Sequence, residues 1–321
     1  MAKLLGLHHL TAITSSSPKM FNFMSGILGL HLIKKTVNQD DIRTYHLYFT
    51  DDRGAAGTDI TFFDFPGQFQ GNKGRNSIER IGFRVPNDAA LAYWQQRFTD
   101  HQIEHEPIVT EFGAKTLRFY DFDHERYQLV SDEVNHGVPA GTPYRDSPVP
   151  AEFAISGLGP MRITVNYFTQ MEKVLIDLLG FEKVATEGQQ TLYEVDSGGH
   201  GAQVIVADEQ LPADEVQAYG TVHHLAFRTA DEKELRDWIE KITAAGLRQS
   251  GFVDRFYFKS EYFRPGPGVL FEIATDGPGF LVDETYEEAG VHLELPPFLE
   301  AQRADIEAHL VPFNTDKKVV D

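Results

Sequence analysis

The feature that most constrains the fold is an internal repeat, because four stretches of the chain follow the same order of elements. Each stretch begins with a strand-like segment, continues with an amphipathic helix and ends with further strands. The four opening strands are expected at residues 7–14, 77–85, 161–166 and 221–229. The four helices, in which apolar residues recur at helical spacing, are expected at residues 18–28, 88–100, 169–179 and 231–245. This repetition predicts four βαβββ units.

A stretch rich in Pro and Gly, residues 135–159, separates the second unit from the third and is expected to connect two halves of the chain. The predicted domains are residues 1–134, with units one and two, and residues 160–276, with units three and four. Residues 277–321 form an acidic, proline-interrupted C-terminal extension, and the sequence does not indicate its role.

Charge and cysteine content exclude several kinds of site. The 321 residues carry a net charge of −19, which disfavours a surface for nucleic acid or anionic membranes. No cysteine occurs, so disulfides, thiolate metal sites and a cysteine nucleophile are excluded, and a reducing cytoplasm fits. Neither a signal peptide nor a transmembrane segment is predicted. We therefore expect a cytoplasmic protein, and the sequence leaves open whether it forms a homo-oligomer.

Two strands of the repeat carry paired histidines. The first unit opens with His8 and His9, and the fourth opens with His223 and His224, each pair followed by a leucine. The last strand of unit four carries Glu272 inside an apolar run. A buried carboxylate is costly unless it is paired or bound to metal. Two histidines and one carboxylate on separate strands indicate a non-haem iron(II) site, which keeps open positions for substrate and oxygen.

Comparison of the four units predicts a single site of this kind. The positions of His9 and His224 are held in units two and three by arginines, Arg80 and Arg162. The position of Glu272 is held in the other units by Gln128, Val204 and, approximately, Thr61. Only units one and four keep residues that bind metal. We therefore expect these two units to pack together across the length of the chain, and units two and three to pair with each other.

These residues resemble those of a known superfamily. Four βαβββ units, with histidine on a first strand and glutamate on a last strand, are similar to the vicinal oxygen chelate proteins, which include glyoxalase I, antibiotic-resistance proteins and extradiol dioxygenases. The stretches Leu-His-His-Leu, Val-His-His-Leu and Gly-Pro-Gly-Val-Leu-Phe-Glu-Ile resemble most closely the hydroquinone-type ring-cleaving dioxygenases of that superfamily. The resemblance covers nearly the full chain, including the tail segment Leu-Pro-Pro-Phe-Leu-Glu. It implies an α+β fold in which the four βαβββ units form two domains of curled mixed β-sheets.

The resemblance also implies a set of site residues. The metal would be iron(II), or another divalent metal in a purified sample, and its ligands would be His9, His224 and Glu272. The residues around the substrate would be His8, Thr11, His223, Arg255 and Tyr262. Arg255 would stabilise developing negative charge. Tyr262, together with His8 or His223, would transfer protons.

The residue pattern alone leaves some of these assignments open. Neighbouring residues of a regular strand point to opposite faces, so only one histidine of each pair faces the metal. Spacing cannot say which one, and the resemblance favours the second. His8 and His223 would reach the same pocket only from a bulged or twisted strand, and otherwise they face the surface. Without the resemblance, the other three substrate positions are ordinary strand residues. The remaining histidines, His46 among them, show no partner pattern and are expected to be solvated or satisfied.

The expected function is that of an iron(II)-dependent, extradiol-type dioxygenase, which opens a hydroquinone-type or related aromatic diol with O2. Its partners would be that small aromatic diol and O2, with no nucleic acid and no membrane. One alternative is a glyoxalase-like metal-dependent isomerase or transferase, but such sites usually use a second carboxylate and the repeats offer one. The other alternative is a non-catalytic resistance protein that binds a drug or quinone, and the complete ligand set argues against it.

Overall fold

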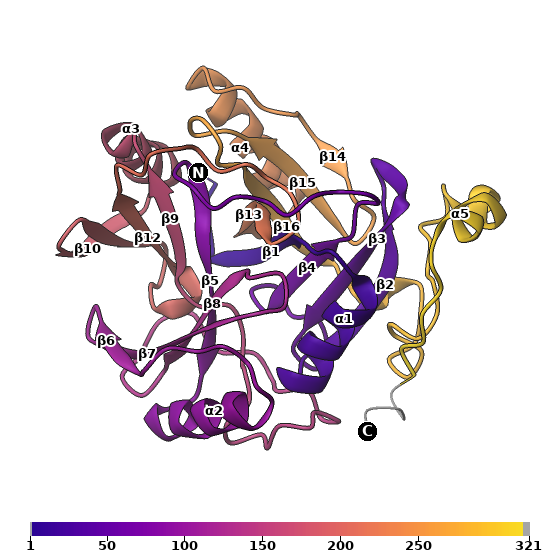
Figure 1. Cartoon of the computed structure of the whole chain (residues 1–321). Helices are drawn as coiled ribbons and strands as arrows, with labels where there is room; N and C mark the ends of the chain where they lie inside the picture. Colours follow the sequence, from indigo (N-terminus) through magenta and orange to yellow (C-terminus); the bar gives the residue numbers. More distant parts are fainter. Residues whose placement is uncertain (1, 317–321) are drawn as a thin grey trace.

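The computed structural model describes residues 2–316 of the chain. In this part of the chain, sixteen strands form two eight-stranded sheets, and each sheet is built from two of the four predicted units. Both sheets combine parallel with antiparallel pairs, and they lie side by side as curled layers (Figure 1). The predicted α+β architecture of curled mixed sheets is confirmed.

The first sheet contains units one and four, in the strand order β14-β15-β16-β13-β1-β4-β3-β2. The strands of unit one are β1 (Leu7–Ile13), β2 (His31–Asn38), β3 (Asp41–Thr50) and β4 (Asp59–Phe63). The strands of unit four are β13 (Thr221–Thr229), β14 (Val253–Asp254), β15 (Phe258–Phe263) and β16 (Phe271–Pro278). Since β1 pairs antiparallel with β13, the first and last units meet at the centre of this sheet.

The second sheet contains units two and three, in the strand order β10-β11-β12-β9-β5-β8-β7-β6. The strands of unit two are β5 (Ser77–Val85), β6 (Val109–Glu111), β7 (Ala114–Tyr120) and β8 (Arg126–Ser131). The strands of unit three are β9 (Met161–Val165), β10 (Glu182–Glu187), β11 (Gln190–Glu194) and β12 (Gln203–Asp208). Here β5 and β9 form the antiparallel pair that joins the two units.

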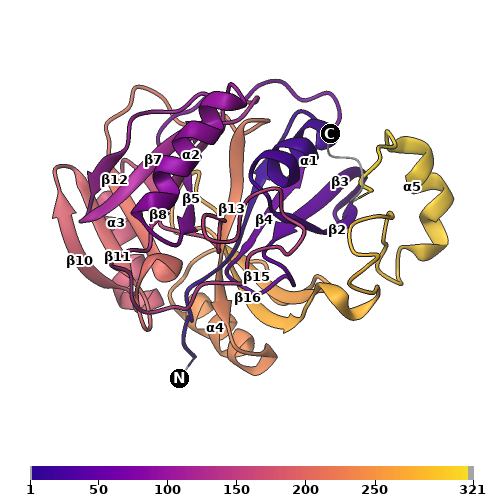
Figure 2. The same cartoon turned by 90° about the horizontal axis from the view of Figure 1, so that it is seen from below.

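The chain leaves the first sheet after unit one, builds the second sheet from units two and three, and returns with unit four (Figure 2). The expectation that units one and four pack together, and units two and three likewise, is confirmed. The division of the chain into domains at residues 134 and 159 stays a prediction.

A helical segment follows the opening strand of each unit. In units two and four it is a regular α-helix, α2 (Asp88–Asp100) or α4 (Glu232–Ala244), which begins behind an Asn or Asp N-cap. In units one and three it has two parts, α1 (Ser17–Phe21) with a π-helical turn at Asn22–Ile27, and α3 (Phe168–Lys173) with one at Val174–Leu179. A single π turn is a local change in hydrogen-bond pattern, which the apolar spacing does not reveal, so the sequence predicted the extent of these helices and not their type.

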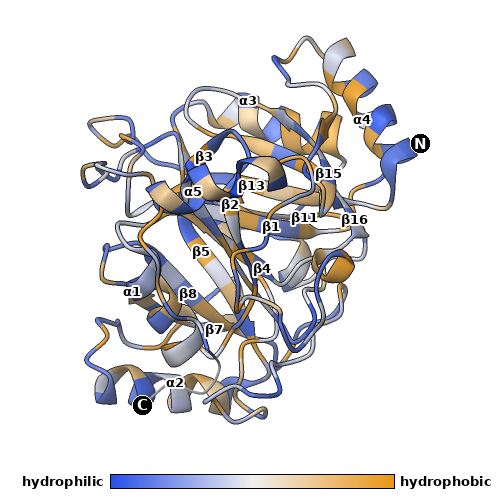
Figure 3. Cartoon of the chain, turned by 90° about the vertical axis from the view of Figure 1, so that its right-hand side faces the viewer, coloured by the Kyte–Doolittle hydropathy of each residue, from blue (hydrophilic) through white to orange (hydrophobic). Residues whose placement is uncertain are grey.

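Apolar side chains fill the space between each sheet and its helices, and Figure 3 shows the hydrophobic colour along the strands. Trp94 of α2 and Trp238 of α4 are almost fully buried. The helix α2 packs on β7 and β8, and α4 packs on β15 and β16. Because the helices cover the outer face of each sheet, the inner face of the curl is left to line a site.

The C-terminal extension lies beside β2 and β3 at the edge of the first sheet (Figure 1). Its helical segments are Phe280–Val282, Glu300–Gln302 and α5 (Arg303–His309). The buried ammonium of Lys34, on β2, binds it through the carboxylates of Asp283, at 2.8 Å, and Glu284. Within residues 2–316, no helix is long and apolar enough to cross a membrane.

Candidate metal centre

Three neighbouring strands of the first sheet bring the predicted ligands together. His9 lies on β1, His224 on β13 and Glu272 on β16, and all three side chains are buried. The Nε2 atoms of the two histidines are 3.1 Å apart, and Glu272 Oε2 lies 3.1 Å and 2.9 Å from them. In the described part of the chain, this is the one group of three such side chains close enough to hold an ion.

The three donor atoms fit a single metal ion. Nitrogen and oxygen donors bind such ions at about 2.1 Å, so two ligands at right angles are about 3.0 Å apart. The contacts of Glu272 Oε2 with the two rings do not have hydrogen-bond geometry, and no other described residue provides a partner. An oxygen of this kind is expected where its lone pair serves a metal. A set of two histidines and one carboxylate leaves the opposite face of the ion open.

Two β-bulges explain how both histidines of each pair reach one site. The ladder between β1 and β13 contains one extra residue on each strand, which is His8 on β1 and His223 on β13. A bulge interrupts the strict alternation of side chains, so the extra residue can point to the same side as its neighbour. The sequence required a bulged or twisted strand if His8 and His223 were to reach the site, and both strands carry such a bulge.

His8 determines which nitrogen of His9 carries the proton. The two Nδ1 atoms lie 2.8 Å apart, and His8 Nε2 lies 3.0 Å from the carbonyl oxygen of Thr275. Since a carbonyl only accepts, the proton of a neutral His8 is on Nε2, and its Nδ1 accepts from His9 Nδ1–H. The Nε2 lone pair of His9 is then available to a metal. Burial, and after it the neighbouring His9, lowers the pKa of His8 to about 3, which keeps this ring neutral.

His223 repeats the arrangement on β13. Its Nδ1 lies 2.8 Å from Nδ1 of His224. If His224 binds a metal through Nε2, its Nδ1–H donates to His223, whose own proton is then on Nε2. Burial, and after it His224, lowers the pKa of His223 to about 3. Because His223 also borders the cavity next to the triad, its Nε2–H is placed to donate to a bound molecule.

Glu272 is held as a carboxylate. Its Oε1 accepts a short hydrogen bond from the hydroxyl of Ser260, on β15. Burial alone would raise the pKa of Glu272, but the adjacent imidazoles, His9 first and then His224, outweigh it and keep the pKa well below its usual value. The buried negative charge is then available to balance a divalent cation.

A cavity of about 280 Å³ opens beside the triad. Phenylalanine rings form much of its apolar wall, from Phe63, Phe65 and Phe258. An apolar cavity of about 150 Å³ already accommodates benzene, so this one has room for a substituted aromatic ring. Four of the five predicted substrate residues border it, namely Thr11, His223, Arg255 and Tyr262, whereas His8 contacts His9.

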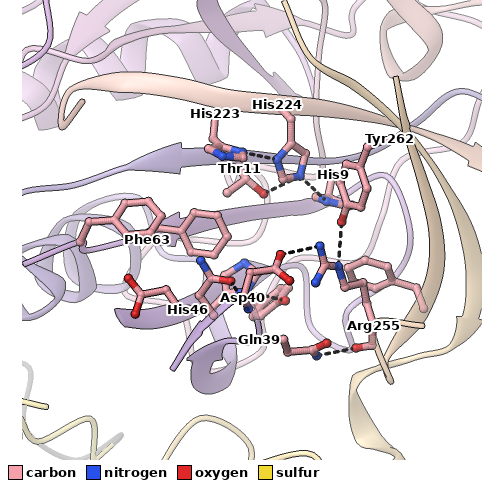
Figure 4. A pocket seen from close by; sticks show the side chains of 15 residues that line it. His9, Thr11, Gln39, Asp40, His46, Phe63, His223, His224, Arg255 and Tyr262 are labelled. Atoms are coloured by element: carbon pink, nitrogen blue, oxygen red, sulfur yellow. Dashed lines mark hydrogen bonds and ion pairs between the residues drawn. The ribbon is translucent and has the colours of Figure 1, made fainter. Parts of the chain in front are cut away.

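Arg255 and Tyr262 meet at the wall of this cavity (Figure 4). Arg255 Nε donates to the Tyr262 hydroxyl at 3.0 Å, and its Nη2 donates to Asp40 at 2.8 Å. The side-chain amide of Gln39 donates to the carbonyl oxygen of Arg255 at 2.9 Å. These contacts tie the turn between β2 and β3 to the segment between β14 and β15. Burial raises the pKa of Tyr262, so its phenol keeps the proton.

The structure adds residues to this wall that sequence reasoning missed. His46 and Tyr48, both on β3, border the cavity, and His46 is hydrogen-bonded to Tyr48 and to Thr61 of β4. Both ring nitrogens of His46 therefore have hydrogen-bond partners, as expected, but the residue lies in the wall of the site. The sequence signal for these residues was weak, because alternating His, Tyr and Thr are common on any strand.

The sequence alignment of unit three was wrong by two residues. His9 lies opposite Ala226 in the first sheet, and Arg80 lies opposite Arg162 in the second. Arg162 therefore corresponds to Ala226 and not to His224. An apolar alternation of period two looks the same after a shift of two residues, so the sequence alone could not fix this register.

The same register moves the counterpart of Glu272 in unit three. Arg162 pairs with Ile205 as Ala226 pairs with Glu272, so the counterpart is Ile205 and not Val204. Neither residue binds metal, and the restriction of the ligand set to units one and four is unaffected.

The chain is similar to known proteins over most of its length. Residues 6–130 match the Glyoxalase/Bleomycin resistance protein/Dioxygenase superfamily. MhqA of Bacillus subtilis (strain 168), provisionally named a ring-cleaving dioxygenase, is 43% identical over 316 residues, which cover 97% of this chain and 99% of MhqA. The chlorohydroquinone/hydroquinone 1,2-dioxygenase of Sphingobium indicum is 29% identical over 94% of each chain.

Solved structures share the arrangement of the two sheets. The crystal structure of a provisionally named dioxygenase from Bacillus subtilis subsp. subtilis str. 168 superposes with a TM-score of 0.90 at 34% identity, and the match covers 98% of this chain and 99% of that one. Glyoxalase I from Zea mays, at 13% identity, has the same fold with a TM-score of 0.60 over 86% of this chain and 93% of that one. Identity of 43% over almost the full length decides the assignment. The chain belongs to the glyoxalase/bleomycin resistance protein/dioxygenase superfamily.

Proposed function

We propose that this protein is an iron(II)-dependent ring-cleaving dioxygenase, which opens a hydroquinone-type or related aromatic diol with O2. The observation that carries the proposal is the triad itself, in which His9, His224 and Glu272 converge beside an aromatic-walled cavity. Two histidines and one carboxylate with open positions on one face are typical of non-haem iron(II) oxygenases.

The names of the relatives support the same reaction class. Both MhqA and the Sphingobium indicum protein carry the name of a dioxygenase, and the latter is named for cleavage of hydroquinone between carbons 1 and 2. In a 1,4-diol, that bond joins one hydroxyl-bearing carbon to a neighbour that bears hydrogen or chlorine. Cleavage there lies outside the pair of hydroxylated carbons, which supports an extradiol-type reaction for this chain as well.

The ligand set also suits the charge of the reactants. Two neutral imidazoles and one carboxylate around a divalent ion leave a net charge of about +1, which favours a deprotonated diol oxygen. When bound, the metal supplies adjacent open positions on which the diol and O2 meet, and it allows electrons to pass from ring to oxygen. The three protein ligands would hold the ion beside the cavity, which two of them, His9 and His224, border.

Arg255 and Tyr262 would act on the substrate. The Arg255 guanidinium reaches the cavity and already donates to the Tyr262 hydroxyl at 3.0 Å, so negative charge that develops nearby meets a fixed cation. The neutral phenol of Tyr262 can donate a proton to an oxygen of the opening ring. His223 can donate from Nε2 on the other side of the cavity, while His8 acts on His9.

The glyoxalase-like alternative is less well supported. Such a site would use a second carboxylate, and the position in unit one that corresponds to Glu272 is held by Thr61, since Thr11 pairs with Thr61 as Ala226 pairs with Glu272. A non-catalytic binder of drugs or quinones has no need of three converging ligands. The dioxygenase accounts for every residue of the triad.

Oxygen uptake is the direct test of the proposal. The protein is prepared without oxygen, its metal content is measured, and iron-loaded protein is offered hydroquinone, chlorohydroquinone and catechol. We expect about one iron per chain and uptake of one O2 for each para-diol consumed. A hemithioacetal serves as the probe for glyoxalase activity. Iron-loaded protein that consumes no O2 with any diol would refute the proposal, and conversion of the hemithioacetal would favour the alternative.

A further inference from the structure

A row of hydrogen bonds begins at Thr11, beside the triad, and runs along the inner face of the first sheet. Thr11 Oγ1 lies 2.9 Å from His224 Nε2 and 2.8 Å from Thr61 Oγ1. Thr61 Oγ1 lies 2.8 Å from Nε2 of His46, and Nδ1 of His46 lies 2.8 Å from the Tyr48 hydroxyl. The row thus leads from Thr11 on β1 to Tyr48 on β3, a strand two places further along the sheet.

The strand register explains why these groups meet. Tyr48 pairs with Thr61, Thr61 pairs with Thr11, and Thr11 pairs with His224, so four directly opposed residues cross β3, β4, β1 and β13. Directly opposed residues are the closest side-chain neighbours in a sheet. His46 stands two residues before Tyr48 on the same face of β3, and its ring closes the gap between Tyr48 and Thr61.

Each member of the row can both give and accept a proton. A neutral imidazole donates from one nitrogen and accepts on the other, and hydroxyl groups do both. Burial keeps the pKa of His46 well below its usual value, so the ring is neutral. The row can therefore be polarised in either direction, toward Tyr48 or toward Thr11, without creating a charge inside the protein.

We propose that Thr61, His46 and Tyr48 form a proton relay that takes a proton from the diol hydroxyl bound beside Thr11. The relay rests on the proposed function, because it requires a hydroxyl-bearing substrate at the open face of the metal site. His46 and Tyr48 border the cavity, whereas Thr61 lies behind Thr11 and acts through it. His46 is thus a positioning residue for Thr61 and a carrier of the proton.

The proton transfer is balanced at every position. At the start His46 Nδ1–H donates to Tyr48, and Thr11 and Thr61 donate along the row toward His46 Nε2. The substrate O–H bond breaks as Thr11 takes its proton, Thr11 passes one to Thr61, and Thr61 passes one to His46 Nε2. His46 passes its Nδ1 proton to Tyr48, which releases its own proton to water in the cavity. No electrons move, and reversal of the row returns a proton to the oxygen of the product.

The test separates the relay from a purely structural role through a step that involves no turnover. Zinc replaces iron, because zinc holds the diol without redox chemistry. Hydroquinone is mixed with the zinc-loaded protein without oxygen, and the rate at which the bound diol becomes its anion is followed by ultraviolet absorbance in H2O and D2O. The parent should show fast ionisation with a solvent isotope effect.

Three variants interrupt the row in different ways. Thr61→Val removes the hydroxyl at nearly constant shape, and Tyr48→Phe removes the last hydroxyl. His46→Gln can keep a hydrogen bond to Thr61, but an amide does not exchange protons as an imidazole does. Each is expected to bind zinc like the parent and to slow ionisation of the diol by about 10²-fold, the lower end of the range for a positioned base.

A matched control uses Thr36→Val. Thr36 lies opposite His46 on β2, and its buried hydroxyl has no hydrogen-bond partner among the described residues. This variant should ionise the diol at the parental rate. The relay would be overturned if Thr61→Val and His46→Gln both ionised the diol at the parental rate. It would also be overturned if Thr61→Val were slow while His46→Gln kept the parental rate, because Thr61 would then only position the substrate.

The two proposals can fail separately. If iron-loaded parent protein cleaves no diol and zinc-loaded protein binds none, the dioxygenase assignment and the relay both fall. If the parent cleaves hydroquinone while the three variants ionise it at the parental rate, the dioxygenase stands and the relay falls. Should Thr61→Val fail to fold, the comparison of His46→Gln with Tyr48→Phe decides the question.

Discussion

The centres of the two sheets share a backbone feature and fill it with opposite chemistry. In the first sheet the extra residue of the bulge on β1 is His8, whose Nδ1 lies 2.8 Å from Nδ1 of the candidate ligand His9. In the second sheet the extra residue of the bulge on β5 is Glu79. Its carboxylate pairs with three arginines, at 3.5 Å from Arg80, 2.5 Å from Arg126 and 3.0 Å from Arg162. The fold provides the same bulge in the central strand pair of both sheets. The residues there decide whether donor atoms remain available to a metal, as in the first sheet, or are used in ion pairs, as in the second.

The space around the two centres differs accordingly. Both sheets have a polar contact between separate segments at the rim, from Arg255 to Asp40 in the first and from the Phe112 backbone N–H to Glu187, at the end of β10, in the second. The cavity of the first sheet measures about 280 Å³, and the pocket of the second measures about 50 Å³. Burial would raise the pKa of Glu79, but Arg80 and the other arginines lower it, so this carboxylate is ionised and ion-paired. Three guanidinium groups around one carboxylate repel a metal cation.

The largest expected effect is loss of the metal from the first sheet. His9→Ala, His224→Ala and Glu272→Ala should each remove most of the roughly one ion per chain, since a three-ligand site does not survive as two. Their counterparts in the second sheet provide the control, and Arg80→Ala and Gln128→Ala should keep the parental metal content. Metal analysis of oxygen-free preparations measures both. Two ions per chain in the parent, or parental content in all three ligand variants, would contradict the single site.

A smaller effect is expected where a residue meets the substrate and not the metal. Tyr262→Phe and Arg255→Ala should keep the metal and lose about 10²–10⁴-fold in the rate of oxygen uptake with hydroquinone. The reason is that Tyr262 supplies a proton and Arg255 supplies a positive charge during the reaction. The rates are compared at equal iron content and saturating diol. Parental turnover in both variants would show that the two residues only support the strand that carries them.

Local patterns in the sequence pointed to the two histidine pairs and to Glu272, and the family resemblance selected the second histidine of each pair as the candidate ligand. Strand alternation, helix periodicity and a carboxylate inside an apolar run are visible in short windows around His9, His224 and Glu272. The pairing of units one and four followed from the ligand set, since a metal holds its ligands within a few ångströms. These parts of the site needed no knowledge of how the strands pair.

The parts that the sequence did not predict all depend on register between distant strands. The bulges at His8 and His223 exist only because β1 and β13 each carry an extra residue relative to the other. The misalignment of Arg162 has the same origin, because a shift by two residues preserves the apolar pattern. Thr61 and His46 became visible only when strand pairing placed them in one row with Thr11. Register is a property of two strands together, and one strand cannot reveal it.

Removing the buried charge of Glu79 from the second sheet should lower the stability of the protein and leave its metal content unchanged. Glu79→Gln leaves Arg80 and Arg162 without their buried counter-charge, and breaking a buried ion pair on one side typically costs about 3–5 kcal/mol. Urea denaturation should show a decrease of this size in the free energy of unfolding, with metal content unchanged. Glu232→Gln, which removes an exposed ion pair with Arg236 on α4, serves as the control and should cost at most about 0.5 kcal/mol. Equal effects of the two variants would mean that the ion pairs of the second sheet do not stabilise it.

The smallest effect concerns His8, the counterpart of Glu79. His8 accepts a hydrogen bond from His9 Nδ1–H and is itself held by the Thr275 carbonyl, so it fixes the tautomer and the ring orientation of a ligand without touching the metal. Loss of such a support typically lowers metal affinity by about 10–100-fold. His8→Ala should therefore still bind one zinc ion, but lose it to a chelator at a concentration that leaves the parent loaded. His105→Ala is the control. It removes a histidine of unit two that contacts Thr99, far from the first sheet's ligands in the sequence, and it should hold zinc as the parent does. If His8→Ala holds zinc as tightly as the parent, the bulge places His8 near the metal site but His8 does not support metal binding. The two bulge residues, His8 and Glu79, would then differ in residue type and not in a contribution to metal binding.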